Sequence, residues 1–523
     1  MIRPLRTVVP LGLALAVAAA ANPRAGSRQQ AASPPPLARV IWLEDAGDRR
    51  PEAGQLPVYR GIDPQDARLK DYERWIDTEA ARFARRLLYR AAQRFGADPI
   101  FRDPALPVVI RKGGNNGAYG LAIATSRGVE EHPKLPYIIL DPSPTFLGDT
   151  ILHESGHLVH SLAQGRRHDG SRWSAFPHTT FATSDPLTAL AEGYAIHFET
   201  LCGHFGAEAA KQAYYRRLAP SFEAGRGRNA EYFSPVDDLM TFAQVWSRYQ
   251  GVRDGLPALE GHLYPGAYPR TQMDPARDRA RLKTPNAMLA SEGVAASVLF
   301  WISAALAGEH GARPGGGLDQ PGVADAEMIL LEALAPLPPP DSDAFRPDMI
   351  DVVEALGRAN PHVGDIAISR FVDITRGVTA RPAIRERWHT LYDAAIMLDF
   401  DMAKPLVAQM DVERGEIVTR ARQDISTLRA GIGPVIPVRV KGATFELKAL
   451  GERMPIEFDL NGMSEAEMAL LPALNADARA RIARERERAP FASAADFASR
   501  AGCTLEQMGL LEVPLKARRT PAR

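Results

Sequence analysis

The chain has 523 residues, of which 45% are hydrophobic, enough to form more than one core. A chain of this length predicts roughly two to four domains. Lys and Arg together number 63, as do Asp and Glu, so the formal net charge is zero. This balance argues against a protein whose whole surface attracts nucleic acid or anionic lipid.

The N-terminus has the pattern of a secretory signal peptide. Arg3 and Arg6 precede a short apolar stretch, residues 8–21, that ends in alanines. This stretch is shorter than the roughly 20 residues of a membrane span, which favours cleavage over an uncleaved anchor. We therefore expect removal of residues 1–21, export to the periplasm or the cell exterior, and no transmembrane segment afterwards. Residues 22–36, polar and rich in proline, are expected to form a flexible leader.

Only two cysteines occur, Cys202 and Cys503, fewer than a small disulfide-stapled secreted domain carries. They fall in segments that we expect to belong to different domains, and neither is part of a metal-binding Cys-x-x-Cys. Two separate thiols are the favoured interpretation, and a disulfide between them is the alternative.

The first part of the chain combines helical and β-type patterns. Residues 38–43 predict a first strand, and apolar residues at helical spacing predict one amphipathic helix over 72–95, ending near Gly96. Three short β-type runs follow at residues 107–111, 117–125 and 137–140. This order predicts an α+β fold with a small antiparallel sheet.

From about residue 146 to about residue 400 the pattern is mostly helical. One segment, residues 293–306, is apolar all round but too short for a comfortable membrane span, which predicts a buried helix. We expect a signal peptide (1–21), a leader (22–36), an α+β domain (37–215), a helical domain (216–430), a β-type linker (431–454), a small helical module (455–515) and a basic tail (516–523).

An HExxH motif lies on a predicted helix between Asp149, a candidate N-cap, and Gly165, a candidate stop. His153 and His157 are four residues apart, so one helical turn brings both imidazoles to the same face. Glu154 would lie beside a bound metal ion, where it can take a proton from water. Because the helix is otherwise apolar, these polar groups need partners, which a metal ion supplies. The alternative is a hydrogen-bonded histidine pair on an ordinary helix.

A catalytic zinc ion needs a third protein ligand, and Glu192 is the favoured candidate. It lies in a predicted helix that Asp185 would cap and Pro186 would begin. Its neighbours are Ala and Leu, and a carboxylate is costly to bury unless it is paired or binds metal. Gly193 leaves room for close packing of another helix. The alternative is a solvent-facing Glu192 on an amphipathic helix.

Three nearby residues are rival ligands. His160 lies near the face of His157 and is expected to be structural, for example through a hydrogen bond to a neighbouring helix. Glu199, seven residues after Glu192, shares its face and is either an acceptor for a ligand histidine or an exposed acid. His197 is expected to be packed or solvated rather than a ligand.

The run HESGH followed by ALAEGYAIHFE resembles the gluzincin superfamily, the thermolysin-like metallopeptidases of the peptidase MA group. The resemblance implies a thermolysin-like catalytic domain with zinc ligands His153, His157 and Glu192. It implies that Glu154 is the general base and acid. It also implies that the strand at residues 137–140 is the edge that pairs with the substrate backbone.

The chain departs from related patterns at several positions. A metzincin would have glycine and histidine where His160 and Ala163 stand, so that family is excluded. In thermolysin-like helices an Asp follows the Glu ligand by four residues and orients a histidine, whereas this chain has Ile196. Between His157 and Glu192 lie 34 residues, and the insert at 166–183 is expected to form a loop near the site.

The resemblance implies hydrolysis of a peptide or protein substrate. Zinc would lower the pKa of its bound water and polarise the scissile carbonyl. Glu154 would take the proton and later deliver it to the leaving amine. A Tyr or His usually stabilises the oxyanion, and the sequence does not choose among its candidates. They are His178, Tyr194, Tyr214 and Tyr232.

Residues 457–501 resemble the helix-hairpin-helix module of ComEA-type DNA-uptake proteins, through a Leu-Pro step and a second helix ending at Arg488. In that family a Gly-x-Gly hairpin binds DNA phosphate. Here the hairpin, 473–477, has no glycine and carries Asp477 at its tip, which would repel phosphate. We therefore expect a packing or protein-interaction role, and nucleic acid is not a favoured partner.

Three functions follow from these patterns. The leading one is an exported zinc peptidase. The second is a catalytically weak or inactive relative that binds a protein or another ligand of the cell envelope. The third is an envelope protein that binds DNA through its C-terminal module.

Overall fold

The structure is a computed structural model of the chain, and the part that it describes begins at Leu37. The predictions for residues 1–36, the insert at 166–183, the boundary after residue 215 and the last seven residues lie outside the described residues. The described residues are 37–47, 55–96, 104–112, 116–141, 147–165, 186–207, 209, 252–253, 255–260, 281–337, 347–397, 399–432, 436–440, 443–447, 458–459, 461, 468, 475–502 and 515–516.

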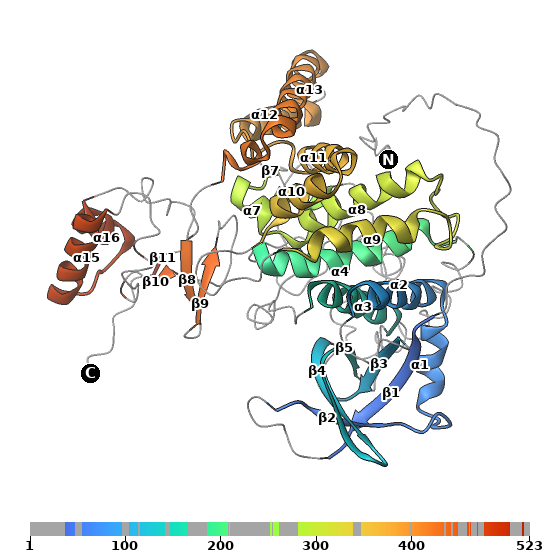
Figure 1. The fold of residues 1–523 in the computed structure, drawn as a ribbon. Helices are drawn as coiled ribbons and strands as arrows, with labels where there is room; N and C mark the ends of the chain where they lie inside the picture. Colours follow the sequence, from blue (N-terminus) through green and yellow to red (C-terminus); the bar gives the residue numbers. More distant parts are fainter. Residues whose placement is uncertain are drawn as a thin grey trace, which may run out of the picture. The chain divides into compact units, whose positions relative to one another are not determined.

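Five strands close into a small barrel in the order β1-β2-β4-β5-β3 (Figure 1). The pairs β1–β2 and β4–β5 are antiparallel, and the other three pairs are parallel. The expected antiparallel sheet is therefore wrong, because the helices between β2 and β3 form a crossover that returns β3 parallel to β1. The strands are β1 (Arg39–Asp45), β2 (Val58–Gly61), β3 (Ala105–Ile110), β4 (Asn116–Thr125) and β5 (Gly128–Leu140).

The predicted helix over residues 72–95 is two helices, α1 (Leu69–Ile76) and α2 (Glu79–Phe95). Thr78 separates them, because its backbone is extended and its hydroxyl accepts a hydrogen bond from the Ala81 N–H. A side-chain cap of this kind satisfies a donor that the first turn of a helix leaves free. The predicted end near Gly96 is confirmed.

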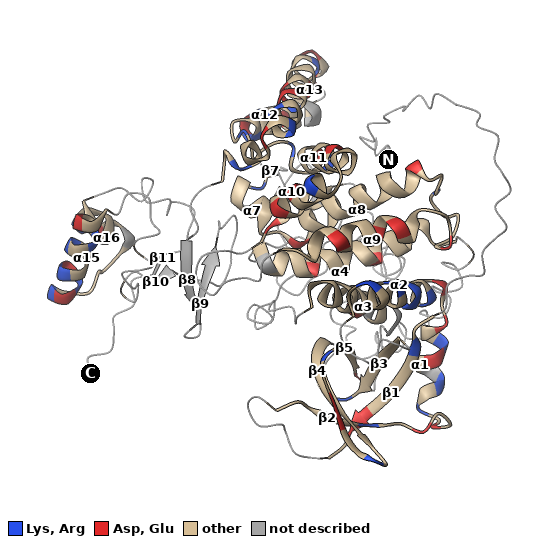
Figure 2. Cartoon of the chain, viewed as in Figure 1, with Lys and Arg blue, Asp and Glu red and all other residues tan. Residues whose placement is uncertain are grey.

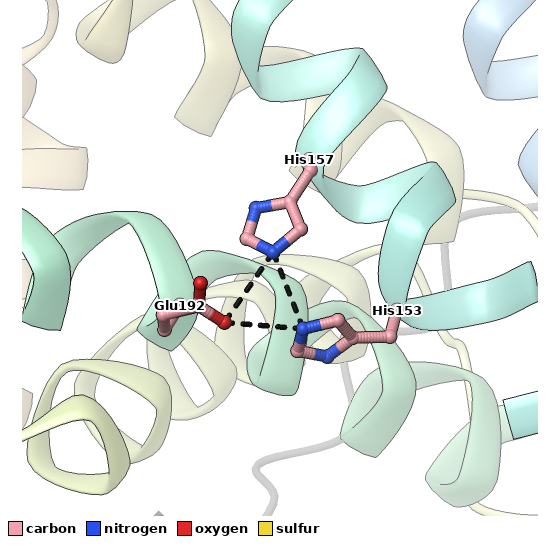
Figure 3. A group of neighbouring side chains, drawn as sticks. All are labelled: His153, His157 and Glu192. Atoms are coloured by element: carbon pink, nitrogen blue, oxygen red, sulfur yellow. Dashed lines mark hydrogen bonds and ion pairs between the residues drawn. The ribbon is translucent and has the colours of Figure 1, made fainter. Parts of the chain in front are cut away.

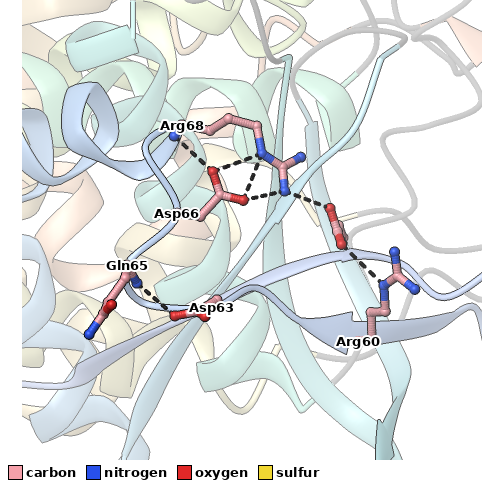
Figure 4. A network of polar contacts seen from close by, with 6 residues as sticks. Arg60, Asp63, Gln65, Asp66 and Arg68 are labelled. Carbon is pink, nitrogen blue, oxygen red and sulfur yellow. Dashed lines mark hydrogen bonds and ion pairs between the residues drawn. The ribbon is translucent and has the colours of Figure 1, made fainter.

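A network of charged side chains holds the turn between β2 and α1 (Figure 4). Arg68 lies 2.6 Å from Asp66 and 3.0 Å from Glu44 on β1, and Arg60 lies 3.1 Å from the same Glu44. Both arginine side chains are more than half exposed. Exposed ion pairs contribute little to stability, so the network mainly fixes the start of α1.

The rest of the described chain up to Gln423 is mostly helical, as predicted. Its longer helices are α3 (Leu147–Gln164), α4 (Pro186–Phe205), α7 (Pro285–Leu289), α8 (Glu292–Glu309), α9 (Val323–Leu334), α10 (Met349–Ala359), α11 (Pro361–Thr375), α12 (Ile384–Ile396) and α13 (Phe400–Gln423). Short elements join them: 3₁₀ turns η3 (Leu256–Ala258) and η4 (Ile425–Arg429), and the strand pair β6 (Leu259–Glu260) and β7 (Arg281–Leu282).

One continuous hydrophobic core runs from Ala38 to Leu428, so the barrel and the helices share it. Helix α8 crosses this core and is apolar on every side. By length and composition it could cross a membrane, but 72% of it is buried inside the protein. This burial confirms the prediction of a buried helix. Cys202 on α4 is a buried free thiol, in agreement with the interpretation of separate thiols, and Cys503 lies outside the described residues.

The described residues of the C-terminal part include two small β pairs and two helices. The predicted β-type segment forms the antiparallel hairpin of β8 (Ile436–Val440) and β9 (Ala443–Leu447), and β10 (Phe458–Asp459) pairs with β11 (Leu515–Lys516). The helices are α15 (Ala476–Arg488) and α16 (Ala494–Ala501). Asp477 lies in the first turn of α15, so its predicted place at a hairpin tip is wrong: Asn475 caps the helix just before it.

Candidate metal centre

Helix α3 carries the HExxH motif and packs on α2, α4, β4 and β5. It ends at Gln164, before Gly165, as predicted. It begins at Leu147, so Asp149 lies inside the first turn and the prediction that it caps the helix is wrong. The helix thus begins three residues earlier than a cap at Asp149 would place it.

Helix α4 begins at Pro186, as predicted, and lies between α3 and α8. A Cβ on Gly156 would lie 2.9 Å from the Cα of Ala195, so α3 and α4 cross at this point. A Cβ on Gly193 would lie 2.6 Å from the Cβ of Ala295 on α8. The prediction that Gly193 allows close helix packing is confirmed, and this packing holds Glu192 over α3.

The side chains of His153, His157 and Glu192 meet between α3 and α4 (Figure 3). His153 Nε2 lies 3.1 Å from Glu192 Oε2 and 3.2 Å from His157 Nε2. The third separation, from His157 Nε2 to Glu192 Oε2, is 3.4 Å. The side chains remain 24%, 14% and 18% exposed in chain order, so small molecules can reach them. This group can hold a metal ion.

The electrostatics of the group favour a cation. Burial lowers the pKa of His153, but the carboxylates of Glu192 and Glu199 raise it further, so the net pKa is well above its usual value. Burial raises the pKa of Glu192, but His157 and His153 lower it to well below its usual value. Positive charge is therefore favoured at the point where the three side chains converge, whether a proton or a metal ion carries it.

Glu199 lies behind the group and is 1% exposed. Its Oε1 is 2.8 Å from Nδ1 of His153, so the carboxylate accepts a hydrogen bond from the N–H at that nitrogen. The lone pair of a neutral His153 is then on Nε2, which points at His157 and Glu192. Of the two predicted roles, the structure supports the acceptor role, and the exposed acid is wrong. Glu199 occupies the place of an orienting acid, while Ile196 is buried and apolar.

Replacing Glu199 with glutamine is expected to weaken zinc binding by about 10- to 100-fold, because the amide cannot hold the tautomer of His153 as a carboxylate does. The measurement is competition for zinc against a chromophoric chelator at neutral pH. Glu131→Gln, at an exposed position of β5, is the control and should bind zinc as the wild type does. Equal affinities for the two variants would contradict this role of Glu199.

Glu154 lies beside the group and is 7% exposed. Burial is the main cause that raises the pKa of its carboxyl, and the nearby His153, His157 and the Gly117 N–H oppose this rise. Its Oε2 accepts no hydrogen bond from the described residues. A carboxylate with a raised pKa and an available oxygen is suited to accept a proton from water.

Tyr194 does not reach this group. Its ring is fully buried, and its hydroxyl donates to Glu327 Oε2 at 3.1 Å on another face of α4. The prediction of Tyr194 as an oxyanion donor is therefore wrong, because two residues along a helix turn a side chain by about 200°. The other candidates, His178, Tyr214 and Tyr232, lie outside the described residues.

The two rival histidines are packed, as predicted. His160 is fully buried, and its ring lies 4.9 Å from the ring of Tyr194. His197 is also fully buried, and its Nε2 lies 3.0 Å from Glu327 Oε1. Neither belongs to the group of potential metal ligands among the described residues.

The strand at residues 137–140 is paired on both sides. Ile138 of β5 lies opposite Val108 of β3 and Gly117 of β4. The implied role of this strand as a free edge for substrate is therefore wrong, because barrel closure places β3 beside it. On its other side, the described pairing of β4 with β2 covers residues 122–124, and β4 also packs on α3.

Gly117 is a site residue that the sequence reasoning missed. A Cβ at this position would lie 3.2 Å from the Cβ of His157 and 3.3 Å from Glu154 Oε2. Its backbone N–H lies near the Glu154 carboxyl and lowers the pKa of that group. Glycine inside a predicted strand often marks a close approach of the backbone to another group, so the glycine-rich run 117–120 was the available signal.

If this group of residues catalyses peptide hydrolysis, replacing Gly117 with valine should lower kcat at least 10-fold, because its methyl groups must displace the Glu154 carboxylate or His157. Gly61→Val on β2 is the matched control, since a Cβ at Gly61 meets nothing within 4 Å. The measurement is steady-state hydrolysis of a fluorogenic peptide together with the melting temperature. Wild-type kcat in a folded Gly117→Val protein would contradict the assigned contact.

In comparisons with known proteins, no family model, curated protein or solved structure matches this chain. The chemistry of the site is therefore inferred from its own residues. Two imidazole nitrogens and one carboxylate oxygen are a ligand set for a divalent metal ion. A second carboxylate beside that set, Glu154, adds a group that can move a proton.

Proposed function

We propose that the protein is a zinc-dependent peptidase that acts outside the cytoplasm after export. The observation that carries this proposal is the spacing of the three donor atoms, 3.1, 3.2 and 3.4 Å. Two ligands bonded to tetrahedral zinc at about 2.0–2.1 Å are separated by roughly 3.3 Å. Three protein ligands leave the fourth position of the ion for water or substrate, as in catalytic rather than structural zinc sites.

Zinc at this position would supply a Lewis acid for a carbonyl oxygen and an activated water molecule. The chain itself supplies the remaining parts of the reaction. Glu154 takes a proton from the attacking water and delivers it to the leaving amine. Glu199 holds the tautomer of His153, and the absence of a side chain at Gly117 leaves room for the carboxylate of Glu154.

The substrate class is supported by the backbone next to the site. The first half of β4 lies beside the helix that carries HExxH, and an extended peptide can add to strand backbone through main-chain hydrogen bonds. The gluzincin-like order of HExxH and a later Glu ligand agrees with a peptide substrate.

A second candidate is a metal-binding protein of the cell envelope without peptidase activity. One observation favours it: Tyr194, the described candidate for the oxyanion donor, is turned towards Glu327. A site without such a donor loses about 100- to 1,000-fold in kcat. The peptidase proposal therefore requires that the donor comes from elsewhere in the chain.

The deciding experiment measures zinc content and hydrolysis on the same purified full-length protein. We expect one zinc ion per chain by elemental analysis, cleavage of casein and fluorogenic peptides, loss of cleavage with a chelator, and recovery with stoichiometric zinc. One bound zinc ion with no cleavage above that of Glu154→Gln would support the second candidate. Absence of stoichiometric zinc would reject both.

A further inference from the structure

A buried polar cluster lies where α4, α8 and α9 meet. At its centre is the carboxylate of Glu327 on α9, which is fully buried. Three side chains donate hydrogen bonds to it: the Tyr194 hydroxyl at 3.1 Å, His197 Nε2 at 3.0 Å and the Ser303 hydroxyl at 2.6 Å. Ser303 belongs to α8, and none of the four side chains is exposed. The cluster therefore joins three helices through one carboxylate.

The carboxylate of Glu327 is ionised. Burial raises its pKa, but His197, Ser303 and Tyr194 lower it further, so the net pKa is below its usual value. An ionised carboxylate only accepts hydrogen bonds, so the proton in the contact with His197 is on Nε2. Hydrogen bonds to a charged group are stronger than neutral ones, which makes the contacts directional constraints on α4.

Two of the donors come from α4, the helix that carries Glu192. Tyr194 and His197 follow Glu192 by two and five residues, which places them about 200° and 140° around the helix from it. Glu199, seven residues after Glu192, returns to the same face. The side chains of Glu192 and Glu199 thus engage α3 on one side of α4, while Tyr194 and His197 engage Glu327 on the other.

The contacts on the two sides of α4 oppose rotation of this helix about its own axis. Side-chain tips lie about 5–6 Å from a helix axis, so a rotation of about 10° moves the Glu192 carboxylate by about 1 Å. Metal coordination tolerates about 0.2 Å. A small rotation of α4 therefore removes Glu192 from its coordination distance and also weakens the contact between Glu199 and His153.

Stability alone does not require this carboxylate. Replacing a buried charged network by apolar side chains of similar volume is often neutral or stabilising. The neighbouring positions Leu330 and Leu331 on the same helix are fully buried leucines, so α9 accommodates apolar side chains in this core. A directional acceptor at position 327 instead specifies the orientation of α4.

We infer that Glu327 is a positioning residue of the metal site: through Tyr194 and His197 it fixes the rotation of α4 that brings Glu192 and Glu199 to His153. Helix α9, which carries Glu327, is itself held in place. Helix α9 is tied to α2 by the ion pairs Arg90–Asp325 at 2.7 Å and Arg94–Glu332 at 2.9 Å. This inference rests on one part of the proposed function, namely that His153, His157 and Glu192 bind zinc.

The test compares Glu327→Leu with Asp348→Leu in the full-length protein. Asp348 is also a fully buried, ion-paired carboxylate, but it lies before α10, which packs on α9 and α11. We expect Glu327→Leu to weaken zinc binding by about 10- to 100-fold, the usual effect of losing a residue that orients a metal ligand. The visible absorption spectrum of the Co²⁺-loaded protein should also change. Asp348→Leu should lower the melting temperature without either effect.

Two milder variants test the inference if the Glu327→Leu protein does not fold. Glu327→Gln keeps the volume and one acceptor oxygen and should retain most of the zinc affinity, while Tyr194→Phe should lose part of it. Wild-type affinity and cobalt spectrum in folded Glu327→Leu or Tyr194→Phe would overturn the inference, as would equal losses in Asp348→Leu. A wild-type protein that binds no zinc would instead overturn the proposed function itself.

Discussion

Replacing Glu154 with glutamine is expected to lower kcat for peptide hydrolysis by about 100- to 10,000-fold, the usual contribution of a general acid–base group. The amide has nearly the same shape as the carboxylate but cannot accept a proton from water. Glu154 contributes none of the three ligand atoms, so the zinc content should stay at one ion per chain. KM should change little, because the proposed role of Glu154 is proton transfer in the transition state and not substrate binding.

The measurement for this variant is kcat and KM on a fluorogenic peptide, with zinc measured on the same sample. Glu131→Gln, an exposed substitution on β5, is the control for a change of charge. Loss of zinc in Glu154→Gln would show that the carboxylate holds the ion. Activity within about three-fold of the wild type would place the proton transfer on another group.

Removal of the third ligand by Glu192→Ala is expected to weaken zinc binding by roughly 100-fold or more, beyond the effect of losing a partner of a ligand. Two imidazoles at the spacing of His153 and His157 would remain, and they bind an ion far less tightly than three donors. Hydrolysis should fall with the zinc content and recover partly at high zinc concentration.

This variant separates the metal site from an ordinary histidine pair. Zinc affinity comes from competition with a chelator, and the melting temperature is followed with and without zinc. The wild type should be stabilised by zinc according to its affinity, and Glu192→Ala should lose most of that shift. Equal zinc-dependent increases in melting temperature in both proteins would exclude Glu192 as a ligand, because removal of a ligand must reduce the stabilisation by zinc.

Local sequence was sufficient wherever short-range chemistry decides the structure. The four-residue spacing of His153 and His157 places both on one face of any helix that contains them. The apolar surroundings of Glu192 predicted a carboxylate that needs a partner, and the structure brings it to the histidines. The end of α2 at Gly96 and the start of α4 at Pro186 were also predicted from single residues.

Tertiary structure alone decided everything that depends on which segments meet. Closure of the barrel, not the pattern of residues 137–140, determines that β5 is flanked on both sides. The role of Tyr194 depended on the position of Glu327, 133 residues away in the chain. The sequence by itself thus predicted the candidate ligands and the candidate base, the HExxH residues from their local spacing and Glu192 from its apolar neighbours. Only the fold determined their neighbours, Glu199, Gly117 and Glu327, because packing between distant elements selects one of several faces that a helix or strand offers.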